Sequence, residues 1–131
     1  MGSTTAESHE SGDQGTPPVL VSAFRERMKE VGLDHVVDEA FRMFVRNAPK
    51  RIERLREALA GGDPAATEAS AHALRSSSLN IWAMGLAGLL SRLESAAEAT
   101  DLELAGGLLA SVEDELDRVL AFLSAVLAGE G

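Results

Sequence analysis

Residues 34–60 read DHVVDEAFRMFVRNAPKRIERLREALA, and apolar side chains recur along this stretch at steps of three and four. The series consists of Val37, Phe41, Phe44, Ala48, Ile52, Leu55 and Leu59. A helix turns by about 100° per residue, so this spacing places the whole series on one face. Gly61-Gly62 follows and is typical of a helix end. The stretch predicts one long amphipathic helix, from about residue 34 to 60, whose apolar face must be covered by other elements.

The segments on either side of this stretch also read as helices. A shorter series with a spacing of four precedes it, formed by Leu20, Phe24 and Met28. This series predicts a short helix over residues 19–31 that ends at Gly32. On the other side, Asp63-Pro64 predicts a helix start, because Asp caps free backbone N–H groups and Pro fits the first helical position. That helix is expected to run to Leu79 or Asn80.

Two further helices are expected towards the C-terminus. The first spans about residues 82–99, with Leu86, Leu89, Leu90, Leu93 and Ala97 facing inward. The second is capped by Thr100 or Asp101 and runs to about Leu127, and its apolar face consists of Leu109, Val112, Leu116, Val119, Leu123 and Val126. Both series keep the helical steps of three and four.

These elements together define the fold class. Aromatic residues make up only 4% of the chain, no segment alternates as a strand would, and no internal repeat is present. Amphipathic helices joined by short loops bury their apolar faces against one another. We therefore predict an all-α protein, an antiparallel four-helix bundle with an additional short N-terminal helix. Residues 1–17 are polar and are expected to form a disordered tail, which leaves residues 18–128 for the bundle.

Composition excludes several classes of function. The net charge of −9 repels nucleic acids and anionic membranes, so neither is expected as a partner. The absence of cysteine excludes a disulfide scaffold and a thiolate metal site. The longest apolar stretch, residues 79–90, is too short to span a bilayer, and no signal sequence opens the chain. These features indicate a cytoplasmic protein.

The helix over residues 63–80 carries the candidate chemistry. Its predicted core face consists of Thr67, Ala71, Leu74 and Ser78, continued by Ile81. His72 lies on the opposite face, towards solvent, with Arg75 one turn further on. Imidazole is a nucleophile in its neutral form, and a nearby arginine neutralises the charge of a phosphoryl group. This arrangement suits a phosphoryl carrier.

Other interpretations of the same residues are open at this point. A single exposed histidine on a helix most often has no function. Glu68 and His72, four residues apart, could form half of a metal site, but no second cluster of ligands is visible, so we expect no metal and no cofactor in this chain. The methionines Met28, Met43 and Met84 are interpreted as core filling.

Residues 71–95, AHALRSSSLNIWAMGLAGLLSRLES, decide between these interpretations, because they resemble the signature of histidine-containing phosphotransfer (HPt) domains. The positions in register are Ala71, His72, Leu74, Ser77, Ser78, Ala83, Leu86, Leu93 and Glu94, with Arg75 where the family usually has lysine. Upstream, residues 44–49 and Gly62-Asp63 are similar to further parts of the family pattern. The resemblance covers roughly residues 19–127. Two positions depart from it, since Ser76 and Trp82 stand where the family has glycine.

The resemblance implies a phosphorelay intermediate. His72 would accept a phosphoryl group from the aspartate of a response-regulator receiver domain, or from a hybrid histidine kinase, and pass it to another receiver. Arg75 would offset phosphate charge, Ser76 would set access to the ring, and Glu94 would orient the ring by a hydrogen bond. Mg²⁺ is expected on the partner receiver and not on this chain, and a monomer fits the family.

The expected docking surface surrounds the histidine. Glu68, Ala69 and Leu79 are the candidate partner-binding residues, together with exposed residues of the helix over residues 34–60. The alternatives are a degenerate HPt-like adaptor that binds receivers or kinases without phosphotransfer, as the changes at Ser76 and Trp82 suggest, and a helical adaptor unrelated to phosphorelays.

Overall fold

The computed structural model describes residues 16–129 of the 131-residue chain. The predicted disordered tail, including His9, lies outside this range apart from Thr16 and Pro17. The described residues form five α-helices, a short 3-10 helix and no strand, which confirms the all-α prediction. The elements are α2 (Val21–Glu30), the 3-10 helix η2 (Asp34–Val36), α3 (Val37–Ala60), α4 (Pro64–Asn80), α5 (Met84–Glu98) and α6 (Leu102–Leu127).

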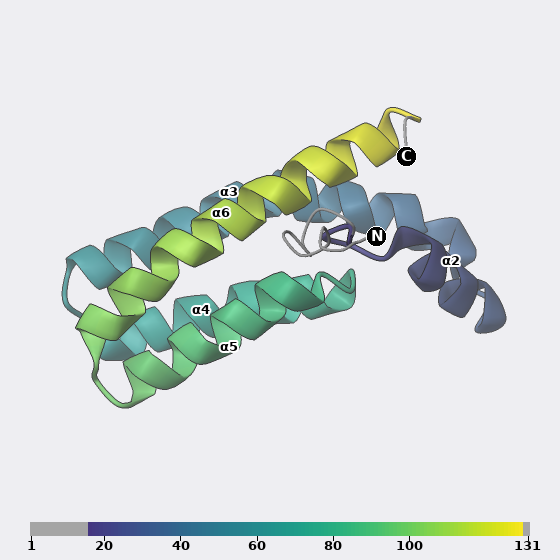
Figure 1. Ribbon diagram of the computed structural model, residues 1–131. Coiled ribbons are helices and arrows are strands. Elements are labelled where there is room, and N and C mark those ends of the chain that lie inside the picture. Colours follow the sequence, from purple (N-terminus) through teal and green to yellow (C-terminus); the bar gives the residue numbers. More distant parts are fainter. Residues whose placement is uncertain (1–15, 130–131) are drawn as a thin grey trace, which may run out of the picture.

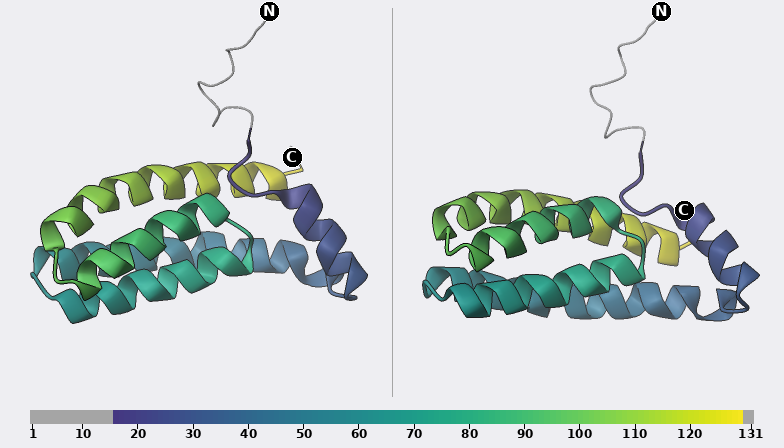
Figure 2. Two further views of the ribbon diagram at one scale, coloured as in Figure 1. Left: turned by 60° about the horizontal axis from the view of Figure 1, so that its bottom comes forward. Right: turned by 90° about the horizontal axis from the view of Figure 1, so that it is seen from below.

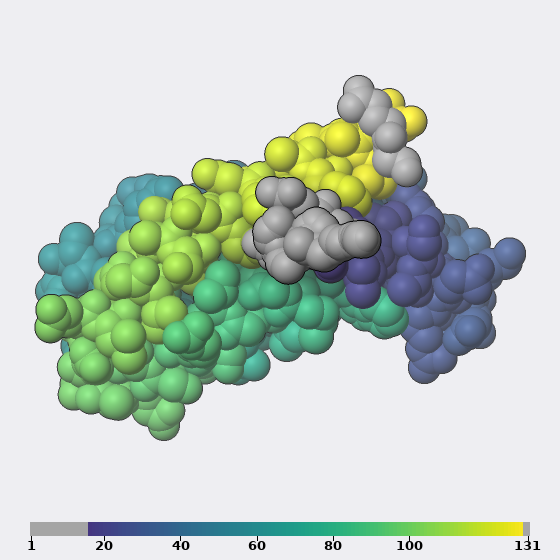
Figure 3. All heavy atoms as spheres, in the orientation of Figure 1, coloured from purple at the N-terminus to yellow at the C-terminus, as the bar shows by residue number. Residues whose placement is uncertain are grey.

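The four long helices form the predicted antiparallel bundle. Each packs against its neighbour in the chain, and α6 closes the bundle by packing against α3 (Figures 1 and 2). The short connections between consecutive helices force antiparallel neighbours. Helix α2 lies across the end of the bundle at which α3 begins and α6 finishes, as the space-filling view also shows (Figure 3).

The core consists of the apolar faces of these helices. Six of the seven residues in the predicted α3 series are buried, and Leu59 is half-buried. In α5 and α6 the buried face differs slightly from the predicted one. Three residues predicted to face inward are only half-buried, namely Leu89, Leu109 and Val126. Four residues outside the predicted series are buried, namely Ala87, Ala96, Ala105 and Leu108. Helices pack on several neighbours at once, so the buried face is wider than a strict series of three and four.

Local hydrogen bonds determine where the helices begin and end. The side chain of Asp63 accepts from the N–H of Ala66 at 3.0 Å, and Asp101 accepts from Leu104 at 3.1 Å. The first bond confirms the predicted cap of α4, and the second identifies Asp101, rather than Thr100, as the cap of α6. Thr100 instead ends α5 in a left-handed conformation, with φ of 56°.

The loop between α4 and α5 corrects one predicted boundary. The helix expected from residue 82 begins at Met84 because Trp82 has φ of 61°, in the left-handed region that ends a helix. The N–H of Trp82 bonds to the carbonyl of Leu79, and the N–H of Ala83 bonds to that of Ser78. These two hydrogen bonds form the Schellman motif, in which glycine usually occupies the left-handed position.

Trp82 also holds α2 in place. Its ring lies 5.4 Å from that of Phe24, which in turn lies 5.7 Å from Phe41 of α3. Trp82 therefore packs within the molecule and is half-buried, so the departure from the family's glycine serves to attach the N-terminal helix.

Three further predictions about the elements were wrong. Residues 34–36, expected to belong to the long helix, form the separate turn η2. Leu20 is 46% exposed, and Val19 is buried in its place, because α2 begins only after both residues. Met43 and Met84 are 46% and 56% exposed and do not fill the core; only Met28 packs against it.

Candidate functional site

Helix α4 presents two opposite faces, as predicted. Thr67, Ala71, Leu74 and Ser78 are buried, and the two hydroxyl groups donate to backbone carbonyls one turn earlier. The side chain of His72 is 57% exposed on the other face. The rigid backbone of a packed helix therefore holds an accessible imidazole at a defined place on the surface.

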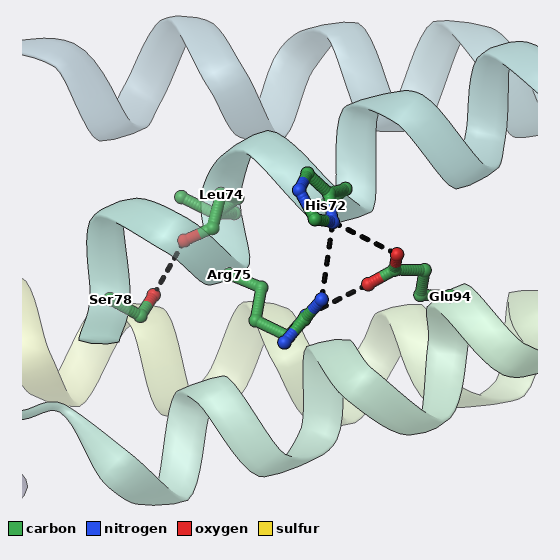
Figure 4. Close-up of polar contacts among 5 residues, drawn as sticks. All are labelled: His72, Leu74, Arg75, Ser78 and Glu94. Atoms are coloured by element: carbon green, nitrogen blue, oxygen red, sulfur yellow. Dashed lines mark hydrogen bonds and ion pairs between the residues drawn. The ribbon is translucent and has the colours of Figure 1, made fainter. Parts of the chain in front are cut away.

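His72 belongs to a three-residue polar cluster that joins α4 to α5 (Figure 4). Its Nδ1 lies 3.0 Å from Oε2 of Glu94, which reaches across from α5. Arg75 donates from Nε to Oε1 of the same carboxylate at 2.8 Å. Nη2 of Arg75 lies 3.1 Å from Nδ1 of His72. Glu94 is thus shared by the histidine and the arginine.

Both polar contacts of His72 are made by Nδ1. The Glu94 carboxylate can only accept and the Arg75 guanidinium can only donate, so the two contacts require opposite tautomers and cannot both be hydrogen bonds of a neutral ring. When Nδ1 carries the proton and donates to Glu94, the lone pair is on Nε2, which none of the contacts of the cluster engages. The side chain of Glu94 is only 18% exposed, which strengthens its hydrogen bonds. The geometry therefore leaves Nε2 as the nucleophilic atom of the ring.

Arg75 is bound within the cluster. Its side chain is 29% exposed, and Glu94 positions its guanidinium on the Nδ1 side of the ring. The predicted contact with a phosphoryl group on Nε2 therefore requires its side chain to rearrange. The role of Arg75 stays a prediction.

The remaining candidate residues surround the imidazole. Ser76 and Ala69 are exposed, Glu68 is half-buried, and Leu79 is 39% exposed. Small side chains flank the ring on α4, so the surface of another protein can approach it closely. None of these residues contacts Glu94 or Arg75 through a polar bond, and their roles stay predictions.

Two other features of the described residues bear on the class of site. No group of three or more His, Asp or Glu side chains gathers within residues 16–129 in a way that could hold a metal ion, so Glu68 and His72 have no third ligand beside them. None of the helices in the same range combines the length and apolarity needed to cross a bilayer.

The sequence patterns missed a groove between α3 and α4. It has a volume of about 250 Å³ and contains Met43, Asn47 and Arg51 of α3 together with Ser77 and Asn80 of α4. One signal was available, since Met43 does not belong to the apolar series of its helix and therefore lies beside the buried face and not within it.

Comparisons with known proteins agree with this description. The family model of the Hpt domain matches residues 39–122. The chain is similar to the crystal structure of histidine-containing phosphotransfer protein B (HptB) from Pseudomonas aeruginosa PAO1, with a TM-score of 0.77 and 26% sequence identity. The alignment covers 86% of this chain and 97% of that one. A search of curated protein sequences found no match.

Proposed function

The chain belongs to the Hpt domain family, whose members act in histidine phosphotransfer, and from this premise we propose that His72 is the residue that carries the phosphoryl group. One observation supports this assignment above all others. His72 is the exposed histidine on α4 whose Nδ1 contacts a shielded carboxylate, which leaves Nε2 free to react. His35, by contrast, lies in the turn η2 and has no polar contact among the described residues.

The reaction is a reversible displacement at phosphorus. The Nε2 lone pair attacks the phosphoryl group of an aspartyl phosphate, the P–O bond to the aspartate breaks, and the aspartate leaves as a carboxylate. The imidazole ring then carries the phosphoryl group on Nε2 and its proton on Nδ1. In the second transfer the carboxylate of another receiver attacks, the P–N bond breaks, and the ring leaves as neutral imidazole.

Glu94 and Arg75 assist by electrostatics. The ring gains positive charge as the P–N bond forms, and a carboxylate 3.0 Å from Nδ1 stabilises that charge. Arg75 holds Glu94 in place in the resting state. In the phosphorylated state its guanidinium turns towards the phosphoryl oxygens and offsets their charge.

The partner is a response-regulator receiver domain or a hybrid histidine kinase. Leu79, Met43 and Val36 are exposed apolar residues on α4, on α3 and on the turn before it, and they provide a docking surface of the kind found at protein interfaces. The receiver supplies Mg²⁺ for the transfer, because the metal is needed where the acyl phosphate is held. A cytoplasmic monomer fits this role, since exchange with successive partners requires an open His72 face.

The test is phosphotransfer from a panel of ³²P-labelled receiver domains of the source organism to the wild-type protein and to His72→Gln. Label that appears on the wild type, is lost in acid, survives in base and is absent from His72→Gln supports the proposal. His35→Gln is the matched control and should accept label as the wild type does. Label on His72→Gln, or no label on the wild type from any receiver, would refute it.

A further inference from the structure

The polar side chains that line the groove between α3 and α4 indicate what kind of group it could bind. Its floor is apolar and includes the buried side chain of Phe44, whereas its rim carries Asn47, Arg51 and Asn80. No acidic side chain lines it. The hydroxyl of Ser77 already donates to the carbonyl of Ala73 at 3.2 Å. Ser77 can therefore only accept in the groove, whereas Asn47 and Asn80 can donate or accept, and Arg51 can only donate. Because Arg51 is the one charged group in the lining, the groove suits a group that accepts and carries negative charge, such as a carboxylate.

Arg51 is the least satisfied of these donors. Its Nε is shielded from solvent and has no hydrogen-bond partner among residues 16–129. A buried donor without an acceptor is unfavourable, and an ionised one more so. By contrast, the neighbouring Arg56 on α3 is paired with Glu53 and Glu113. An acceptor brought into the groove by another molecule would complete the hydrogen bonds of Arg51.

Two more cations extend the positive charge along α3. Lys50 and Arg54 are exposed and form no ion pair within residues 16–129. At 100° per residue, Arg51 and Arg54 lie within roughly 40° of Asn47 around the helix, and Lys50 within roughly 60°. This flank of α3 is therefore positive in a protein whose net charge is −9.

The groove lies close to the reactive histidine. Ser77 follows His72 by five residues and Asn80 by eight, which corresponds to about 7.5 Å and 12 Å along α4. Around α4, Asn80 lies about 80° and Ser77 about 140° from His72, on the side away from Arg75. The groove therefore flanks the His72 face on its α3 side, where a receiver domain docked at Nε2 can reach the rim.

We propose that Arg51, with Lys50 and Arg54 beside it, binds an Asp or Glu side chain on the surface of the receiver domain, next to an apolar residue that packs against Met43. This proposal rests on the proposed phosphotransfer function and adds a specificity-determining site to it. A carboxylate here forms charge-assisted bonds in a partly shielded place, where they are strong. Receivers without an acidic residue at the matching position leave Arg51 unpaired and bind more weakly.

The experiment uses a receiver domain that labels the wild-type protein. We measure the maximal rate of transfer and the half-saturating receiver concentration for wild type, Arg51→Met, Arg51→Lys and Arg92→Met. Arg92, exposed on α5 and about 200° around that helix from Glu94, is the matched control for the loss of one charge. We expect Arg51→Met to raise the half-saturating concentration about tenfold, with a much smaller change in the maximal rate.

Two further measurements distinguish loss of charge from loss of the Nε hydrogen bond as the cause of weaker receiver binding. Arg51→Lys keeps the charge but loses Nε, so it should fall between wild type and Arg51→Met. Added NaCl should weaken the wild type more than Arg51→Met. If the wild type is labelled but Arg51→Met and Arg92→Met behave alike, the groove proposal is wrong and the phosphotransfer function stands. If no receiver labels the wild type, both proposals fail.

Discussion

At the scale of single residues, the Nδ1 contact of His72 is the feature with the clearest chemical consequence. Glu94 holds that nitrogen at 3.0 Å, and Arg75 holds Glu94 at 2.8 Å. The two bonds together orient both the ring and the carboxylate. Catalysis by positioning and charge needs this kind of preorganisation, because the phosphoryl group itself reacts with little covalent help from the protein.

Removing the Glu94 carboxylate should slow the acceptance of the phosphoryl group. We expect Glu94→Ala to lower the transfer rate by about tenfold, because the developing charge on the ring loses its counter-ion. Glu94→Gln should have a smaller effect, since the amide oxygen can still accept from Nδ1. Rapid-quench measurement of label transfer gives the rates, and ¹⁵N NMR of the imidazole reports the tautomer. If Glu94→Ala changed neither the transfer rate nor the tautomer, Glu94 would not act as the counter-ion of the His72 ring.

Ser76 is predicted to set how closely a partner can approach His72, and it is exposed one turn after that residue. We expect Ser76→Phe to block transfer from receiver domains, while labelling by the small donor phosphoramidate continues, because only a protein-sized donor is excluded by the larger side chain. Ser76→Gly should transfer at least as fast as wild type and be less stable by about 0.5 kcal/mol, owing to the poor helix propensity of glycine. Equal loss of both labelling reactions in Ser76→Phe would argue against an effect on access.

At the scale of the helices, the ends of α4 and α5 place non-glycine residues in left-handed conformations. Trp82 and Thr100 have φ of 61° and 56°, where an L-residue is disfavoured by about 1 kcal/mol or more. The two positions differ in what they gain. Trp82 packs against Phe24, whereas Thr100 is exposed.

This difference predicts opposite outcomes for the same substitution. Thr100→Gly should stabilise the protein by about 1 kcal/mol, because it removes backbone strain and loses no packing. Trp82→Gly removes similar strain but loses the contact with Phe24, so its net effect should be destabilising. Urea unfolding followed by circular dichroism measures both. Destabilisation by Thr100→Gly would show that its side-chain bond to the carbonyl of Ala99 outweighs the strain.

At the scale of the whole molecule, Phe24 is the buried residue of α2 and joins this helix to the bundle. Its ring is buried and meets both Phe41 of α3 and Trp82 between α4 and α5. One side chain therefore connects the N-terminal helix to two parts of the fold that are distant in sequence.

Truncating Phe24 should loosen this connection without dismantling the site. We expect Phe24→Ala to lower the free energy of unfolding by about 3 kcal/mol and to shift the fluorescence of Trp82, the chain's single tryptophan, towards longer wavelength. Labelling of His72 should persist, because the cluster with Glu94 and Arg75 belongs to α4 and α5. Leu20→Ala, at an exposed position beside α2, is the control and should change neither quantity appreciably. An unshifted fluorescence spectrum in Phe24→Ala would show that α2 is held by other contacts.

Local interactions explain why so much of the fold could be predicted from the chain alone. The spacing of apolar residues identified the four long helices, and Asp63 marked the start of α4 because capping depends on residues three apart. The same periodicity placed His72 on the face of α4 opposite Leu74. Such features are set within one or two helical turns, so they need no knowledge of distant partners.

Contacts between helices were decided only by the tertiary structure. The resemblance to a known family pointed to Glu94, but the sharing of its carboxylate between His72 and Arg75 depends on how α4 and α5 are aligned. The groove beside Arg51, the exposure of Met43 and the packing of Trp82 on Phe24 likewise depend on which surfaces meet. Periodicity gives the direction of a side chain from its own helix, whereas burial and contact depend on the position of every neighbouring helix.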